Sequence, residues 1–121
     1  MSESNKAILE KANAAIVERD FEGFLSFCTD DTAWTFVGEQ TLEGKQAVRE
    51  WMATAYRDGP PSFKVDRMIA EGDVVAAIGE ITLKDERGME ARHSYCDVWR
   101  FRDGRLAELQ AFVVAAAPAA K

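Results

Sequence analysis

One carboxylate in this chain lies in a setting that needs a chemical explanation. Asp97 belongs to the stretch from Tyr95 to Phe101. At alternate positions this stretch carries Tyr95, Asp97, Trp99 and Phe101, so Asp97 is the one residue of the four that is not aromatic. Alternate residues of a β-strand share one face, so the sequence predicts a carboxylate in a row of aromatic side chains. A carboxylate removed from water must pair, take up a proton or take part in chemistry. Asp97 is therefore the first candidate catalytic residue.

Two more titratable residues are candidates to work with Asp97. His93 belongs to the same predicted strand and the same face, where successive alternate residues lie about 7 Å apart. Glu80 belongs to the preceding strand. An even number of residues in the connecting loop pairs Glu80 with His93 on the inner face, and an odd number puts it outside. A carboxylate beside an imidazole raises the pKa of the imidazole and orients its ring. Asp97, His93 and Glu80 therefore form a candidate acid–base set.

The first half of the chain predicts the elements that close one side of this strand. Residues 5–19 show the periodicity of an amphipathic helix. Asp20 can cap a short aromatic helix that ends before Thr29-Asp30-Asp31, and those three residues are expected to form a solvated turn. Residues 32–37 alternate as a strand, and residues 44–56 carry the apolar stripe of a third helix.

The second half of the chain alternates continuously from Phe63. Three turn signals divide it into strands near 63–70, 74–84, 89–102 and 105–114. Short loops make consecutive strands antiparallel. Residues 115–121 have no large apolar side chain and are expected to form a flexible tail. The 121 residues thus predict a single α+β domain, with three N-terminal helices packed on a curved antiparallel sheet.

Composition excludes several classes of partner. The chain has 15 basic and 21 acidic residues, a net charge of −6, which argues against binding to nucleic acid or an anionic membrane surface. It has no apolar run of about 20 residues and no signal-peptide pattern, so we expect a cytoplasmic protein. Cys28 and Cys96 are expected to be reduced, buried thiols. A single histidine without ligand spacing predicts no metal site.

The order of these elements resembles the nuclear transport factor 2-like (NTF2-like) cone fold. Within it, the chain is similar to the SnoaL-like group, which includes ketosteroid isomerases, polyketide cyclases and limonene epoxide hydrolase. The resemblance covers roughly residues 5–114. Three segments carry it: DDTA at 30–33 entering the first strand, LEGKQAVR at 42–49 opening the third helix, and DVWRFRDGRL at 97–106.

The resemblance implies a cone whose helices close one face of the sheet around an apolar pocket. The outer sheet face would form a homodimer and carry Cys96, Val98, Gln110 and Phe112. The alternative is that most of the inner aromatic side chains simply fill a core. The residues expected to line the pocket and bind ligand are Trp34, Phe36, Trp51, Phe63, Tyr95, Trp99, Leu109 and Ala111.

The catalytic pattern of the group is only partly present. Asp97 matches the strand acid that helps to form the oxyanion hole of ketosteroid isomerases. Phe36 stands where the first strand would carry the general base, and Ala12 where the first helix would carry a tyrosine. Limonene epoxide hydrolase needs Arg-x-Asp, and here Tyr95 replaces the arginine. The resemblance therefore argues against steroid isomerisation and epoxide hydrolysis.

The resemblance favours the inner position for Glu80, opposite His93. In that register the apolar residues of the same strand face outward, which only a dimer interface would tolerate. Those residues are Val75, Ala77, Ile81 and Leu83.

The predicted function is binding of a small hydrophobic molecule in the cone. Asp97, with His93 assisting, would abstract or donate a proton at a carbonyl compound, as an isomerase, cyclase or hydratase without a cofactor. Two alternatives use the same fold. The chain can be a non-catalytic binder, with the same pocket and the same aromatic side chains. It can also be a dimeric assembly module, whose sheet face is the functional surface and whose cone is filled.

Overall fold

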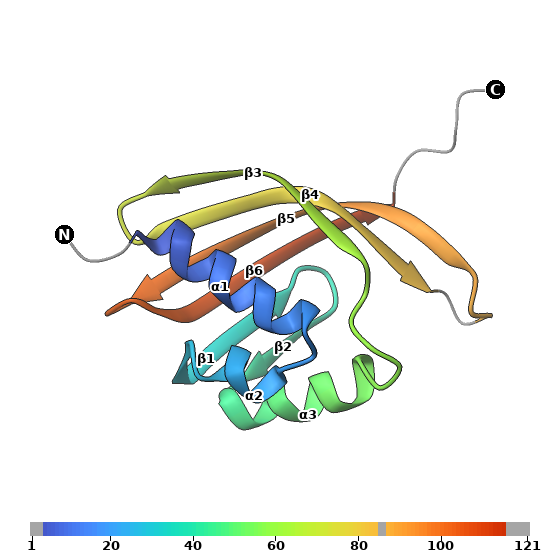
Figure 1. Cartoon of the computed structure of the whole chain (residues 1–121), viewed down its shortest axis with the longest axis horizontal. Helices are drawn as coiled ribbons and strands as arrows, with labels where there is room; N and C mark the ends of the chain where they lie inside the picture. Colours follow the sequence, from blue (N-terminus) through green and yellow to red (C-terminus); the bar gives the residue numbers. More distant parts are fainter. Residues whose placement is uncertain (1–3, 85–86, 116–121) are drawn as a thin grey trace.

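The computed structural model describes residues 4–84 and 87–115 of the chain. Within these residues, three helices and six strands follow one another (Figure 1). They are α1 (Asn5–Val17), α2 (Phe21–Leu25), β1 (Cys28–Phe36), β2 (Gln40–Glu43), α3 (Lys45–Ala55), β3 (Phe63–Glu71), β4 (Val74–Lys84), β5 (Glu90–Arg102) and β6 (Arg105–Ala115).

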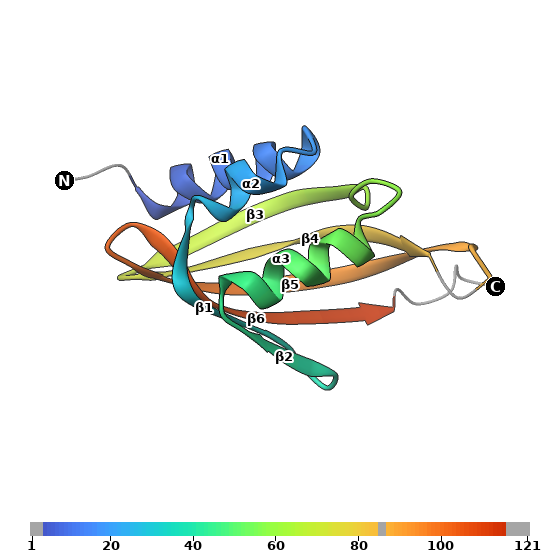
Figure 2. The same ribbon diagram turned by 90° about the horizontal axis from the view of Figure 1, so that it is seen from below.

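The six strands form one curved sheet in the order β2-β1-β6-β5-β4-β3. Neighbouring strands are antiparallel except β1 and β6, which are parallel. All three helices lie on the concave side of the sheet (Figure 2). This is the predicted α+β architecture. No helix in the described part of the chain is long and apolar enough to cross a membrane.

The helices form where their sequences provide caps and apolar faces. The Ser4 hydroxyl accepts a hydrogen bond from the Ala7 amide (3.2 Å), and the Asp20 carboxylate accepts one from the Gly23 amide (3.0 Å). Each helix then buries one face against the sheet. The buried helical residues are Leu9, Ala12 and Ile16 of α1, Phe24 and Leu25 of α2, and Val48 and Met52 of α3.

The predicted turn at Thr29-Asp30-Asp31 is wrong, because these residues lie inside β1. Cys28 was expected at the end of the preceding helix, but it is the first residue of β1. The reason is tertiary: β1 pairs with β6, and the buried Thr32 hydroxyl donates to the Leu106 carbonyl oxygen (3.1 Å). Pairing between distant strands overrides the local turn preference of two adjacent aspartates.

Strand β2 was not predicted, since its four residues are too short for an alternating pattern to show. It pairs with β1, with Leu42 opposite Trp34. The four strands predicted after Phe63 are confirmed. Ala115 ends β6, so it does not belong to a tail, and residues 116–121 lie outside the described residues.

Gly79 on β4 allows β3 to bend across it. The β3–β4 pairing shifts between Val65 and Arg67, next to Gly79. A Cβ atom on Gly79 would overlap the Lys64 carbonyl oxygen and lie 3.1 Å from the Tyr95 ring. The Tyr95 hydroxyl donates to that same Lys64 oxygen (3.4 Å). The missing side chain therefore lets β3, β4 and β5 pack closely at this point.

We predict that Gly79→Ala destabilises the fold by about 1–3 kcal/mol, because the added methyl group must push β3 away. The free energy of unfolding, measured by urea denaturation, tests this. Ser94→Thr adds one carbon at an exposed position of the same sheet, and its effect should stay within about 0.5 kcal/mol. Equal effects of the two substitutions would contradict the prediction.

Candidate functional site

The inward side chains of the sheet form rows that run across the strands. Each row is named here by its β5 residue, and neighbouring rows are about 7 Å apart. The Trp99 row holds Val75, Trp99, Leu109 and Trp34, and the Asp97 row holds Ala77, Asp97, Ala111 and Phe36. The Tyr95 row holds Gly79, Tyr95 and Val113, and the His93 row holds Phe63, Ile81, His93 and Ala115.

The Trp99 row forms a filled aromatic base. The Trp34 ring makes edge contacts with Trp99 (5.6 Å between centroids), Phe24 (5.7 Å) and Trp51 (6.1 Å). Phe36 packs on Trp51 at 5.0 Å. The Trp34 Nε1 atom is buried without a hydrogen-bond partner in the described part of the chain. At this end of the cone the aromatic side chains mainly pack against one another.

Asp97 lies one row further out, between the two alanines Ala77 and Ala111. Both of these cross-strand neighbours have small side chains. Asp97 is half-buried, and no hydrogen bond or ion pair to its carboxyl is found among residues 4–84 and 87–115. Burial raises the pKa of the Asp97 carboxyl to about 7. The prediction that Asp97 faces inward among aromatic side chains is confirmed.

Two tyrosines lie within reach of the Asp97 charge. Burial is the main cause that raises the pKa of both Tyr56 and Tyr95 to about 12, and the Asp97 charge adds to it. Tyr56 caps the end of α3 and packs on Trp51 (5.3 Å) and Phe21 (5.6 Å). Sequence reasoning missed Tyr56 as a site residue. Its spacing four residues after Met52, on the apolar stripe of α3, was the available signal.

His93 shares the face of Asp97 but lies two rows away, roughly 13 Å along the strand. It is half-buried, and its Nδ1 atom lies 3.0 Å from the Ala91 carbonyl oxygen. At this distance His93 reaches Asp97 only through water or a ligand. A catalytic role for His93 stays a prediction.

The expectation that Glu80 faces His93 is wrong. Glu80 pairs with Ser94 on the convex face, and Ile81 lies opposite His93. The last β4–β5 pair, Lys84 with Glu90, leaves residues 85–89 between the strands, an odd number. This register also turns the apolar residues of β4 inward, where burial stabilises them.

The residues expected on the outer face do lie there. Cys96 pairs with Phe112, and Val98 pairs with Gln110, all on the side away from the helices. The Phe112 side chain is 40% exposed. Cys28, by contrast, is fully buried, and burial raises the pKa of its thiol to about 12, so it is an unreactive core residue. No cluster of three metal-ligating side chains occurs within the described residues.

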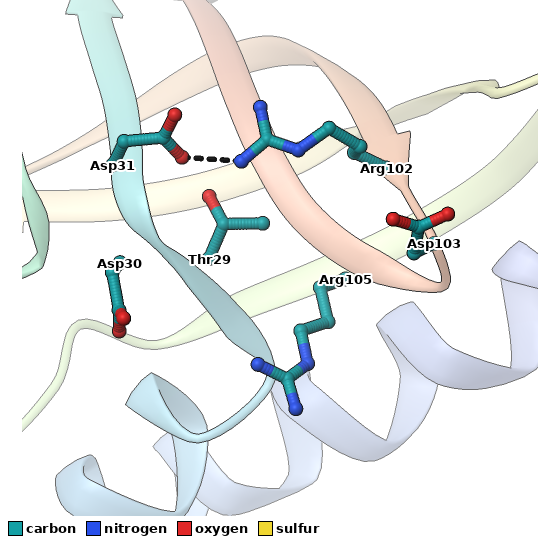
Figure 3. Close-up of a pocket in the computed structure, with 6 residues that line it drawn as sticks. All are labelled: Thr29, Asp30, Asp31, Arg102, Asp103 and Arg105. Carbon is teal, nitrogen blue, oxygen red and sulfur yellow. Dashed lines mark hydrogen bonds and ion pairs between the residues drawn. The ribbon is translucent and has the colours of Figure 1, made fainter.

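A charged hollow of about 460 Å³ lies where β1 meets the β5–β6 hairpin (Figure 3), and Asp97 is not among the residues that line it. There the Arg102 guanidinium donates a hydrogen bond to the Asp31 carboxylate. This hydrogen bond holds the pKa of the Asp31 carboxyl below its usual range. Asp30 points the other way and pairs with Lys45 at 3.4 Å. Both aspartates are exposed and paired with cations, so the hollow has the character of a solvated ionic surface.

The family model described as SnoaL-like domain matches residues 9–109. No curated protein matches the chain. Among solved structures, an NTF2-like protein of unknown function from Cytophaga hutchinsonii is 20% identical, with a TM-score of 0.75 over 92% of this chain and 100% of that chain. TerC, co-crystallised with polyporic acid, is 23% identical, with a TM-score of 0.76 over 88% of each chain.

A third solved structure, AclR from Streptomyces galilaeus, is described as a putative hydroxylase. It is 20% identical, with a TM-score of 0.70 over 92% of this chain and 79% of that chain. At these identities, the structural matches establish the fold and leave the activity open.

We predict that Asp97 makes the fold less stable as the pH rises. Below about pH 4 the carboxyl is neutral in both folded and unfolded chains. Between pH 4 and 7 the unfolded carboxyl loses its proton while the folded one keeps it. The free energy of unfolding of the wild type, relative to Asp97→Asn, should therefore fall by up to about 1.4 kcal/mol per pH unit and level off above pH 7.

Urea denaturation of both proteins between pH 4.5 and 8.5 measures this difference. Asp58→Asn, which changes an exposed aspartate in the α3–β3 loop, serves as the matched control. A difference between wild type and Asp97→Asn that does not vary with pH would contradict the assignment.

Proposed function

Since the chain belongs to the SnoaL-like domain family, we propose that it binds a small hydrophobic molecule inside its cone, with an oxygen of the ligand placed at Asp97. One observation carries the proposal. The carboxyl of Asp97 lies on the inner face between two alanines and near two tyrosines, and no residue of the described ranges 4–84 and 87–115 gives it a hydrogen bond or an ion pair. Removing a carboxyl partly from water without giving it a partner is costly to the fold, and a ligand oxygen would supply that partner.

The pKa of about 7 allows Asp97 to act in either direction near neutral pH. As a neutral acid it donates a hydrogen bond to a carbonyl oxygen. As a carboxylate it accepts a proton from the carbon beside that carbonyl. A carboxylic acid kept neutral by an apolar site is known from ketosteroid isomerase. The proposed chemistry is therefore acid–base catalysis without a cofactor.

The make-up of the Asp97 row limits the reaction class. Phe36 occupies the β1 position in this row, so the row has no second carboxylate. Ala12 on α1 is fully buried. The ketosteroid isomerase pattern of separate base, acid and α1 tyrosine is therefore absent from these positions. A single proton exchange, as in a cyclase or a simple isomerase, fits one titratable group better, with Tyr56 as a second donor to the ligand oxygen.

A non-catalytic binder is the alternative within the same cone. The filled aromatic base and the single carboxyl favour it, since both serve recognition as well as catalysis. TerC, which shares this fold, was co-crystallised with polyporic acid, so an organic ligand is compatible with the fold.

We also propose a homodimer through the convex face of the sheet. Cys96, Val98, Gln110 and Phe112 form a contiguous patch on β5 and β6, and the patch leaves the Phe112 ring 40% exposed. Exposed apolar side chains that adjoin one another are typical of an interface. Two copies related by a two-fold axis would cover this patch with itself.

We predict that the protein speeds deuterium exchange at the α-carbon of small apolar ketones. Acetophenone and 1-tetralone in D2O, followed by proton NMR, are suitable probes. Asp97→Asn should lower the exchange rate by about 10²-fold or more, because the group that accepts the proton is lost. Asp58→Asn removes the same charge from an exposed loop and should leave the rate unchanged.

Ligand binding is followed separately by the change in tryptophan fluorescence. Binding of the ketones without exchange would identify the protein as a non-catalytic binder. Failure of every ketone to bind would contradict the proposed function and leave the assembly module as the remaining interpretation.

The dimer gives a separate prediction. Phe112→Glu should convert a dimer to a monomer in sedimentation velocity, because it places two charges in a self-complementary apolar contact. Val17→Glu adds the same charge at an α1 side chain that is 63% exposed, and the dimer should persist. A wild-type chain that sediments as a monomer at micromolar concentration would contradict the proposal.

A further inference from the structure

We propose that Phe21, the first residue of α2, is a positioning residue that holds the Tyr56 hydroxyl at the ligand oxygen bound by Asp97. This inference rests on the proposed function, in which Tyr56 is the second donor to that oxygen. It adds the part of the chain that places this donor. In this role Phe21 acts through the Tyr56 side chain alone.

The Tyr56 ring lies between rings from two helices that pack side by side (Figure 1). Tyr56 caps α3, and its backbone N–H donates to the Met52 carbonyl oxygen at 2.9 Å. The ring makes an edge contact with Trp51 of the same helix, with 5.3 Å between centroids. It also lies 5.6 Å from the Phe21 ring, tilted by 47°. Among the described residues, Phe21 is therefore the ring contact to Tyr56 that comes from outside α3.

Further ring contacts lead from Tyr56 into the Asp97 row. Trp51 packs on Phe36 at 5.0 Å, and Phe36 is the β1 member of the Asp97 row. Consecutive aromatic contacts thus run from α2 to the inner face of the sheet. The Asp97 charge adds to the burial that raises the pKa of Tyr56. No hydrogen bond to the Tyr56 hydroxyl is found among residues 4–84 and 87–115, so this donor is free to serve a ligand oxygen.

The junction between α1 and α2 gives the Phe21 ring a fixed support. Arg19 adopts the left-handed conformation (φ 65°) that ends many helices. The N–H groups of Arg19 and Asp20 donate to carbonyl oxygens of α1 at 2.9 and 2.8 Å. The Asp20 carboxylate accepts from the Gly23 amide, and a Cβ atom on Gly23 would overlap that carboxylate. Hydrogen bonds on both sides therefore fix the backbone that carries Phe21.

The same junction contacts the segment that follows Tyr56. The Gly59 amide donates to the Tyr56 carbonyl oxygen (2.9 Å) and closes a turn after α3. The Arg19 guanidinium lies against Gly59, where a Cβ atom would be only 2.7 Å from its Nη2 atom. Residues 19–21 thus contact residues 56–59 twice, once through a ring pair and once through a side chain on backbone. Two contacts restrain the end of α3 better than one, and only the ring pair touches Tyr56 itself.

A spectroscopic test uses the fact that the chain has two tyrosines, Tyr56 and Tyr95. Proton–carbon NMR of tyrosine-labelled protein shows two ring systems, and Tyr56→Phe assigns them. Phe21→Leu should shift the Tyr56 ring signals, because the neighbouring ring is lost, and should leave Tyr95 in place. Phe27→Leu is the matched control. Phe27 is also half-buried, lies just beyond α2 and has no ring contact with Tyr56 in the described part of the chain.

A binding test asks whether Phe21 acts through the Tyr56 hydroxyl. The Kd of acetophenone, followed by tryptophan fluorescence, should rise about three- to tenfold in Tyr56→Phe, because one hydrogen bond to the ligand oxygen is lost. Phe21→Leu should raise the Kd by a similar factor in the wild type and by nothing further in Tyr56→Phe. Phe21→Tyr keeps the ring and should restore the wild-type Kd. Phe27→Leu should leave the Kd unchanged, and urea denaturation checks that each variant is folded.

The outcomes separate this inference from the proposed function. If acetophenone binds and Asp97→Asn weakens its binding, but Phe21→Leu raises the Kd equally with and without the Tyr56 hydroxyl, the proposed function stands and the positioning role is wrong. Tyr56 ring signals that Phe21→Leu leaves in place overturn the inference as well. If the wild type binds no ketone, both the proposed function and this inference fail.

Discussion

The pairing of β4 with β5 in one register determines the character of the whole concave face. Lys84 pairs with Glu90, and every following pair keeps this step up to Val74 with Arg100. Ala77 and Gly79 consequently face inward beside Asp97 and Tyr95, and Glu80 faces out. A slip of one residue would reverse all of these positions, exposing Val75 and burying a glutamate. The burial of the β4 apolar residues holds the register, and the register in turn creates the setting of Asp97.

This setting combines two kinds of neighbours that act differently on the carboxyl. Large rings at the base exclude water, which raises the pKa of Asp97 to about 7. Its cross-strand neighbours, Ala77 and Ala111, have small side chains that carry no group able to pair with it. A carboxyl in this position lowers the stability of the fold near neutral pH. Such a cost is common at functional sites, where the same group is needed for binding or chemistry.

Local pattern was sufficient wherever one face of an element is buried and the other is not. The four long strands after Phe63 alternate over eight residues or more, and three glycine-containing turns separate them. The helices were predicted for the same reason. Prediction failed where contacts between distant segments decide. Asp30 and Asp31 have the local preferences of a turn, yet they lie in β1 between Cys28 and Ala33, which both pair with β6. Strand β2 in turn pairs only with β1, which offers it an edge.

The sequence by itself determined the architecture and the inward position of Asp97. Alternate residues of a strand share one face, so Asp97 must lie on the same face of β5 as the large aromatic side chains of Tyr95 and Trp99, which are buried. Through the resemblance to ketosteroid isomerases, it also led us to expect Phe36 and Ala12 at the positions of that group's base and tyrosine. Only the tertiary structure decided that Glu80 lies outside, that Tyr56 lies within reach of the Asp97 charge, and that aromatic side chains fill the cone around Trp34. These features depend on loop parity and on packing between elements far apart in the chain, which no local pattern specifies.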